Sequence, residues 1–256
     1  MLIDTHCHLD LPVFDDDRDA ILSRCVGLGI KRIIVPAIEK KSWQTLIALC
    51  RKNQMLAVAL GLHPVFIEQH QESDLDLLDT QLGLAGVIAV GEIGLDYFIK
   101  TLDKKKQETF FTQQLELAKK HHLPVILHVR KAHDEVLQFL KNTVVKGGIV
   151  HAFNGSIQHA GKYIELGFKL GFGGTLTYEN AHKVHALAKQ LPIESLVLET
   201  DAPDMVVASH RGERNSPEYL TECLAALAKL RGESKQLLAE QTTANAIEVL
   251  GLENVL

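Results

Sequence analysis

The chain has 256 residues, of which 46% are hydrophobic and 23% charged, and its formal net charge is −5. This composition excludes a disordered chain, a collagen-like repeat and a disulfide scaffold. The negative charge excludes an overall basic field that would hold nucleic acid non-specifically. The four cysteines form no CxxC pair, which favours reduced thiols and a cytoplasmic location. No signal peptide is expected at the start, and the longest apolar runs are too short to span a membrane.

Short apolar runs rich in β-branched residues recur along the chain, and each is followed by a turn and a segment of helical period. The predicted strands are Met1–Thr5, Arg32–Ala37, Leu56–Leu60, Val87–Val90, Pro124–Leu127, Gly148–Val150, Phe168–Gly171 and Leu196–Glu199. The predicted helices include Arg18–Leu28, Lys41–Lys52, Gln107–His121 and Pro217–Arg231. This alternation predicts an α/β fold, a TIM-type (β/α)8 barrel with parallel strands, as a single domain over residues 1–256. A doubly wound open sheet is the structural alternative.

Residues of types that commonly bind metals follow the ends of several predicted strands. The first strand runs into His6 and His8, and alternate residues of an extended segment share a face, so Asp4 and both imidazoles point the same way. Four further strands end in polar residues of the same kind, namely Glu92, His128, His151 and Asp201. Barrel active sites lie at the carboxyl ends of the strands. The six side chains are therefore predicted to converge and to hold two divalent ions, with a bridging carboxylate.

The other histidines divide into two groups. His63 follows the third predicted strand and is expected at the same end of the barrel, in contact with substrate or with a metal-binding side chain. The rest fall in apparent helices or loops, where most rings are expected to face solvent: His70, His121, His122, His133, His159, His182, His185 and His210.

Taken together, these motifs resemble the TatD family of metal-dependent deoxyribonucleases, in the amidohydrolase superfamily, and in particular its bacterial YjjV-like branch. The resemblance covers almost the whole chain in the family's order. The matching stretches are IDTHCHLD (3–10), GLHP (61–64), GEIGLDY (91–97), LPVILHVRKA (123–132), VHAFNGS (150–156), LETDAPD (198–204) and RGERNSPEYL (211–220). Departures from the family pattern at Val129, Ala152, Asn154 and Ser216 spare the proposed ligands and bear on substrate contacts.

The resemblance implies two ions with a defined division of ligands. One ion maps to His6, His8, Glu92 and Asp201, and the other to Glu92, His128 and His151. Glu92 would bridge the pair, so no carboxylated lysine is needed. Zn, Mg, Mn, Ni or Co are all compatible with these histidine and carboxylate ligands.

The predicted activity is hydrolysis of DNA phosphodiester bonds by a metal-activated water, with Asp201 and Glu92 as catalytic residues. Arg130 and Arg214 are candidate phosphate contacts that would supply local positive charge, although each could equally be a solvated surface residue. Two alternatives remain open: hydrolysis of a small-molecule phosphoester or amide on the same site, and a non-catalytic metal-binding or partner-binding protein. Neither a membrane nor an obligate protein partner is predicted.

Overall fold

Eight parallel strands form the centre of the protein. The computed structural model describes residues 1–84 and 86–252. The strands follow one another in sheet order: β1 (Leu2–Asp4), β2 (Ile30–Pro36), β3 (Leu56–Leu60), β4 (Val87–Asp96), β5 (Val125–Arg130), β6 (Gly148–Val150), β7 (Phe168–Phe172) and β8 (Leu196–Leu198). The backbone N–H of Thr5 donates to the carbonyl of Leu198 at 3.0 Å, which joins the last strand to the first.

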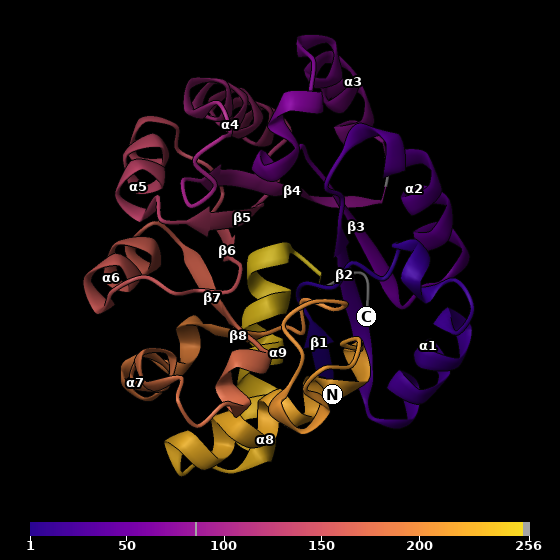
Figure 1. Cartoon of the computed structure of the whole chain (residues 1–256), viewed down its shortest axis with the longest axis vertical. Coiled ribbons are helices and arrows are strands. Elements are labelled where there is room, and N and C mark those ends of the chain that lie inside the picture. The colour runs from indigo at the N-terminus through magenta and orange to yellow at the C-terminus, as the bar shows by residue number, and fades with distance from the viewer. Residues whose placement is uncertain (85, 253–256) are drawn as a thin grey trace.

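Helices follow the strands and surround them as a ring (Figure 1). The helices of the ring are α1 (Arg18–Gly27), α2 (Trp43–Lys52), α3 (Glu72–Leu82), α4 (Lys104–Lys120), α5 (His133–Asn142), α6 (Ile157–Glu165), α7 (His182–Gln190) and α8 (Leu220–Arg231). A further helix, α9 (Lys235–Leu250), follows α8. The predicted single-domain TIM-type barrel is therefore confirmed, and the open doubly wound sheet is excluded.

The element bounds differ from the prediction by six residues at the end of β4 and by at most three residues elsewhere. Strand β4 continues six residues beyond Val90, because a register shift between Val90 and Ile93 lets it pair with β5 as far as Asp96. Helix α4 begins at Lys104 rather than at position 107, since the Asp103 side chain accepts from the Lys106 N–H at 3.0 Å and caps the helix there. Helix α8 is preceded by a short 3-10 turn over residues 217–219.

Two apolar layers hold the barrel together. The larger layer lies between the strands and the outer helices. The smaller layer fills the barrel interior with short side chains such as Ala57, Ala59 and Ala89, and α9 contributes Val249 and Leu250 to it. The prediction did not include α9, which contacts β1, β6, β7 and β8 and lies inside the ring of helices (Figure 1, yellow). One end of the interior is therefore closed by helix α9.

The expectation of exposed histidines is wrong at two positions. His70 is buried because its Nε2 bonds to the His63 carbonyl at 3.0 Å, which fixes the turn before α3. His133 is buried because its ring packs against Phe153 and Tyr163. Separately, among residues 1–84 and 86–252 no helix combines the length and apolarity needed to cross a bilayer.

Candidate metal centre

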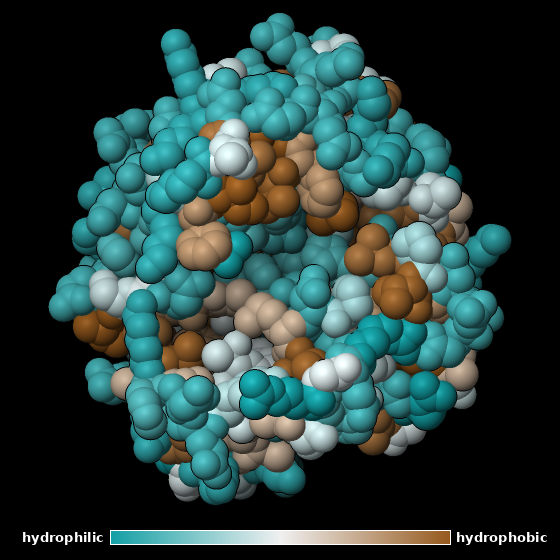
Figure 2. All heavy atoms as spheres, viewed as in Figure 1, coloured by the Kyte–Doolittle hydropathy of each residue, from teal (hydrophilic) through white to brown (hydrophobic). Residues whose placement is uncertain are grey.

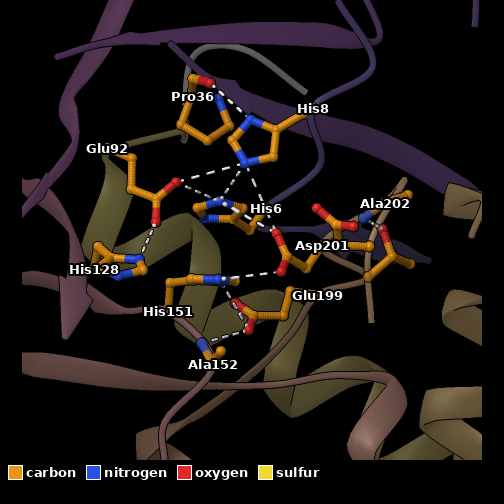
Figure 3. Close-up of polar contacts among 12 residues, drawn as sticks. His6, His8, Pro36, Glu92, His128, His151, Ala152, Glu199, Asp201 and Ala202 are labelled. Carbon is orange, nitrogen blue, oxygen red and sulfur yellow. Dashed lines mark hydrogen bonds and ion pairs between the residues drawn. The ribbon is translucent and has the colours of Figure 1, made fainter. Parts of the chain in front are cut away.

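The His6 and His8 imidazoles lie next to each other just beyond the end of β1, with their ring planes nearly perpendicular (Figure 3). Their Nε2 atoms are 3.3 Å apart. The Pro36 carbonyl lies 3.2 Å from His8 Nδ1 and can accept only an N–H, so neutral His8 carries its proton on Nδ1 and directs the Nε2 lone pair inward. The pair thus presents nitrogen atoms to one point, as the alternation of strand faces predicted.

Glu92 joins two groups of histidines through its two oxygens (Figure 3). Its Oε2 lies 3.1 Å from His6 Nε2 and 3.5 Å from His8 Nε2. Its Oε1 lies 3.0 Å from His128 Nδ1 and 3.2 Å from His63 Nε2. Burial alone would raise the Glu92 pKa, but the surrounding imidazoles hold that pKa well below its ordinary value. An ionised carboxylate with one oxygen on each side is the arrangement that a bridging ligand needs.

Asp96 orients His128 by contacting the ring nitrogen on the side away from Glu92. Its Oδ2 lies 3.2 Å from His128 Nε2, while its Oδ1 accepts the backbone N–H groups of Phe98 and Ile99 at 2.9 and 3.1 Å. A proton on Nε2 of a neutral His128 leaves the Nδ1 lone pair facing Glu92. The sequence reasoning missed Asp96. The signal was present, because Asp96 stands four residues after Glu92 in one strand.

Asp201 completes the His6 and His8 side of the site. Its Oδ1 lies 3.7 Å from His6 Nε2 and 3.8 Å from His8 Nε2, and its Oδ2 lies 3.5 Å from His151 Nε2. The backbone of Asp201 has a φ of 57°, a left-handed conformation that is strained in a non-glycine residue. A 2.8 Å hydrogen bond from the Asp201 N–H to the His6 carbonyl holds this conformation and fixes the carboxylate beside the imidazoles.

Glu199 is a second acid that sequence reasoning left out of the site. It is fully enclosed, with 1% exposure, and its Oε1 lies 3.1 Å from His151 Nδ1 and accepts the Ala152 N–H at 2.7 Å. A Cβ on Gly171 would lie 2.2 Å from Glu199 Oε2, so only glycine leaves room for this carboxylate. Glu199 and Asp201 are alternate residues at the end of one strand, and that spacing was the available signal.

The imidazole pKa values reflect these carboxylates. Burial alone would lower the His8 pKa, but Glu92 and Asp201 outweigh burial and raise it to about 9. The pKa of His128 is also raised against burial, by Asp96 and Glu92. For His151 the pKa is raised well above its ordinary value by Glu199 and Asp201. Each of these rings therefore lies in a field that favours positive charge.

The donor set fits divalent metal cations. Neutral His8 and neutral His128 carry lone pairs on Nε2 and Nδ1, which lie 3.5 and 3.0 Å from carboxylate oxygens of Glu92. A proton or a cation between each nitrogen and the oxygen is therefore needed to offset the repulsion. Nitrogen and carboxylate ligands suit Zn and related ions. Three groups of side chains bring ligand atoms within 4.8 Å of one another: His6, His8 and Glu92; His63, Glu92 and His128; and His6, His151 and Glu199.

The second group differs from the division that the resemblance implied. It contains His63, whereas His151 stacks on His6 with ring centroids 3.7 Å apart. His63 Nδ1 accepts the Val65 N–H at 3.1 Å, so neutral His63 keeps its proton on Nε2 and donates it to Glu92. Burial lowers the pKa of His63 to about 4, which keeps the ring neutral. His63 thus positions Glu92 rather than offering a lone pair.

A hollow lined by both polar and apolar side chains opens beside this cluster. It has a volume of 560 Å³ and is lined in part by His128, His151 and Asp201. Figure 2 shows the face of the molecule hollowed near its centre, with hydrophilic residues in the depression. Arg130 also lines the hollow, and its guanidinium lies 3.8 Å from the centre of the Phe98 ring. This cation is half exposed, so it can meet a ligand that enters.

Arg214 is not among the residues that line this hollow, and it contacts an acid of the protein. Its Nη1 and Nη2 donate to the two carboxylate oxygens of Asp17 at 3.0 and 2.6 Å, and Nη1 also donates to the Val13 carbonyl at 2.7 Å. The guanidinium also stacks on Phe14. Its charge is therefore compensated within the protein, and the side chain ties the loop after β8 to the segment before α1.

Comparison with known proteins agrees with the geometry. The family profile described as TatD related DNase matches residues 3–251. The uncharacterized metal-dependent hydrolase YjjV of Escherichia coli K12 is 43% identical over 246 residues, covering 95% of each chain. An uncharacterized metal-dependent hydrolase of Haemophilus influenzae is 40% identical over 258 residues, covering 96% of this chain and 98% of its own. The crystal structure of the E. coli TatD homologue YjjV superimposes with a TM-score of 0.94 at 42% identity, covering 98% of both chains.

The chain therefore belongs to the TatD family.

Proposed function

We propose that this protein is a metal-dependent hydrolase that cleaves phosphodiester bonds in DNA at a site for two divalent ions. The observation that carries the proposal is the position of Glu92, whose two oxygens contact imidazoles of separate groups within 3.5 Å. Paired divalent ions, when bound, supply a water of lowered pKa and neutralise charge on a transferring phosphoryl group. The names of the E. coli and H. influenzae relatives support metal-dependent hydrolysis, and they specify no substrate.

Side chains of the protein would hold the ions, transfer a proton and orient the ligands. His6, His8, Glu92 and Asp201 would hold one ion, and Glu92 with His128 would hold the other, with His151 beside Asp201. Asp201 lines the hollow as an ionised carboxylate, because His151, His6 and His8 lower its pKa against burial. It is therefore placed to accept the proton of an attacking water and later to return it to the leaving oxygen. His63 and Asp96 keep Glu92 and His128 in orientation.

The rim of the hollow supports a nucleic-acid substrate. Arg130 presents a cation beside Phe98, an aromatic ring that is 52% exposed. A guanidinium binds phosphate oxygens, and an exposed ring can stack on a base. We assign the phosphate contact to Arg130, which is half exposed and lies 3.8 Å from Asp96, because Arg214 donates two shorter hydrogen bonds to Asp17. One cation and one ring would hold a single nucleotide at a chain end, which favours exonuclease action.

The test is time-resolved cleavage of an end-labelled single-stranded DNA oligonucleotide after chelation and reloading with Mg or Mn. Wild type is compared with Asp201→Asn, and bound metal is measured in both. Asp204→Asn is the matched control, because Asp204 lines the same hollow but makes no ion pair among the described residues. We expect a ladder that shortens from one end with wild type and the control, and none with Asp201→Asn.

The other outcomes separate the alternatives. If metal-loaded wild type leaves DNA intact but hydrolyses members of a panel of small phosphomonoesters or amides, the same site acts on a small molecule and the nuclease assignment is wrong. If neither substrate class is turned over although metal is bound, the non-catalytic alternative is favoured.

A further inference from the structure

A second hollow lies away from the metal centre, against the starts of the strands. It has a volume of 730 Å³ and is lined by α1, by the first residues of β2 and by the turn between α2 and β3. Helices α1 and α2 are neighbours in the outer ring (Figure 1). The volume falls within the usual range of small-molecule sites. None of the lining residues belongs to the metal centre.

A buried arginine borders this hollow without a carboxylate partner. Arg32 is only 6% exposed, and its Nη1 donates to the backbone carbonyl of Gln54. Its Nε is buried and has no hydrogen-bond partner in residues 1–84 and 86–252, and no carboxylate within these ranges lies within 4.0 Å of its guanidinium. Buried charged groups are normally paired, because an uncompensated charge loses its hydration. Burial also lowers the pKa of Arg32, with no acid offsetting that effect.

The remaining lining is largely apolar. Leu22 and Met55 form part of the wall, and Val26, which is 55% exposed, stands at the rim. Lys31 adds a second cation, and Asp19 is a carboxylate in the lining that forms no ion pair with Arg32. A cavity with an unpaired guanidinium and aliphatic walls matches a ligand that has an anionic head and a short apolar body.

We propose that this hollow binds a small amphipathic anion whose carboxylate or phosphomonoester head compensates Arg32 and whose apolar part covers Leu22, Val26 and Met55. The site is separate from the proposed hydrolytic function. Its occupancy therefore does not depend on DNA cleavage, and either proposal can fail without the other.

The test uses hexanoate and hexyl phosphate as probes, with hexanamide as the neutral probe of the same length. Binding is followed by the arginine Nε–H resonances of 15N-labelled full-length protein, in which the Arg32 signal is identified by its loss in Arg32→Lys. We expect one or both anions to shift the Arg32 resonance saturably, and the anion that binds more tightly identifies the head group. Hexanamide is expected to bind at least tenfold more weakly.

Variants test whether the positive charge of Arg32 is responsible for anion binding in this hollow. Arg32→Gln is expected to weaken anion binding at least tenfold. Val26→Glu puts a negative charge at the exposed rim without disturbing the core, so it is expected to do the same even if Arg32→Gln fails to fold. Arg51→Gln removes an exposed cation of α2 that does not line the hollow, and should leave binding unchanged. No saturable shift, equal binding of hexanamide, or full binding by folded Arg32→Gln or Val26→Glu would overturn the proposal.

Discussion

The two ends of the barrel interior are built from opposite chemistry on the same eight strands. At the carboxyl ends, buried imidazoles and carboxylates contact one another around Glu92. Deeper in the interior the strands carry alanines and β-branched residues, and α9 covers them with Val249 and Leu250. The carboxyl ends of the strands carry groups that are costly to bury. The end next to α9 carries groups whose burial stabilises the fold.

This difference separates function from stability along each strand. In β1, Ile3 belongs to the apolar interior, while His6 and His8 follow a few residues later in the metal centre. In β4, Ala89 belongs to the interior and Glu92 to the metal centre. Substitutions at one end should therefore change activity more than stability, and substitutions at the other end should do the reverse.

The largest effect is expected at Glu92. Glu92→Gln keeps the size of the side chain but removes the charge that faces both histidine groups, so the ions lose their common ligand. We expect loss of bound metal and a fall in kcat/KM of more than about 10³-fold, or about 4 kcal/mol of transition-state stabilisation. Metal content by elemental analysis and steady-state kinetics measure this. Glu165→Gln, an exposed change on α6, is the control. A Glu92→Gln protein that keeps both ions and full activity would contradict the bridging role.

Leu250→Ala tests the contribution of the apolar end of the barrel interior to stability. Leu250 is 3% exposed in the barrel interior, so truncation leaves a cavity and should lower the free energy of unfolding by about 2–5 kcal/mol. Activity of the folded protein should stay near that of wild type. Urea unfolding and kinetics at 25 °C measure both quantities. Leu237→Ala, at a position 49% exposed on the same helix, should change stability little. A folded Leu250→Ala protein without activity would show that the two ends are coupled.

His133, near the carboxyl ends of the strands, makes the stability of the protein depend on pH. Burial lowers the pKa of His133 to about 4 from an ordinary value of 6.5, so below pH 6.5 the unfolded chain binds a proton that the folded chain does not. The neutral ring's contribution is complete above pH 6.5 and is lost as pH falls towards 4.

Between pH 7 and pH 4.5, wild type should therefore lose about 2–3 kcal/mol more stability than His133→Gln. Urea unfolding at the two pH values measures this difference. His182→Gln removes an exposed imidazole and should follow wild type at both. Parallel losses in wild type and His133→Gln would mean that another group accounts for the acid sensitivity.

The barrel could be predicted from the sequence because alternating strand and helix patterns repeat eight times, and each pattern is local. Helix α9 was missed because it adds a helix after the eighth unit, where the repeat no longer indicates what comes next. Six ligand candidates could be named because metal-binding residue types follow apolar strands. The positions of Arg214 and His133 could not be predicted, since their partners Asp17 and Tyr163 are distant in sequence.

Asp96 and Glu199 show a further limit of sequence reasoning. Both acids lie behind histidines of the metal centre, and the prediction assigned neither of them a role there. Glu199 was assigned to a strand, and its carboxylate fits only because residue 171 is glycine on the neighbouring strand. Which acid contacts which histidine depends on how neighbouring strands pack. The residue pattern of a single strand does not predict this pairing.

The smallest effect we argue is at Glu199. Glu199→Gln keeps an oxygen for the Ala152 N–H but removes the negative charge 3.1 Å from His151 Nδ1. Because a carboxylate behind a histidine orients the ring and raises its basicity, we expect metal affinity to fall about 10–100-fold. Competition with a chromogenic chelator measures that affinity without relying on turnover.

Gly171→Ala reaches the same carboxylate from the neighbouring strand. Its new Cβ would lie 2.2 Å from Glu199 Oε2, so Glu199 must move and metal affinity should fall in the same direction. Gly161→Ala, where a Cβ meets nothing within 4 Å, is the matched control and should bind metal as wild type does. If Glu199→Gln and Gly171→Ala both retain wild-type affinity, Glu199 only anchors the loop after β6 through Ala152. The charged end of the barrel would then consist of the direct ligands alone, with no supporting acid behind His151.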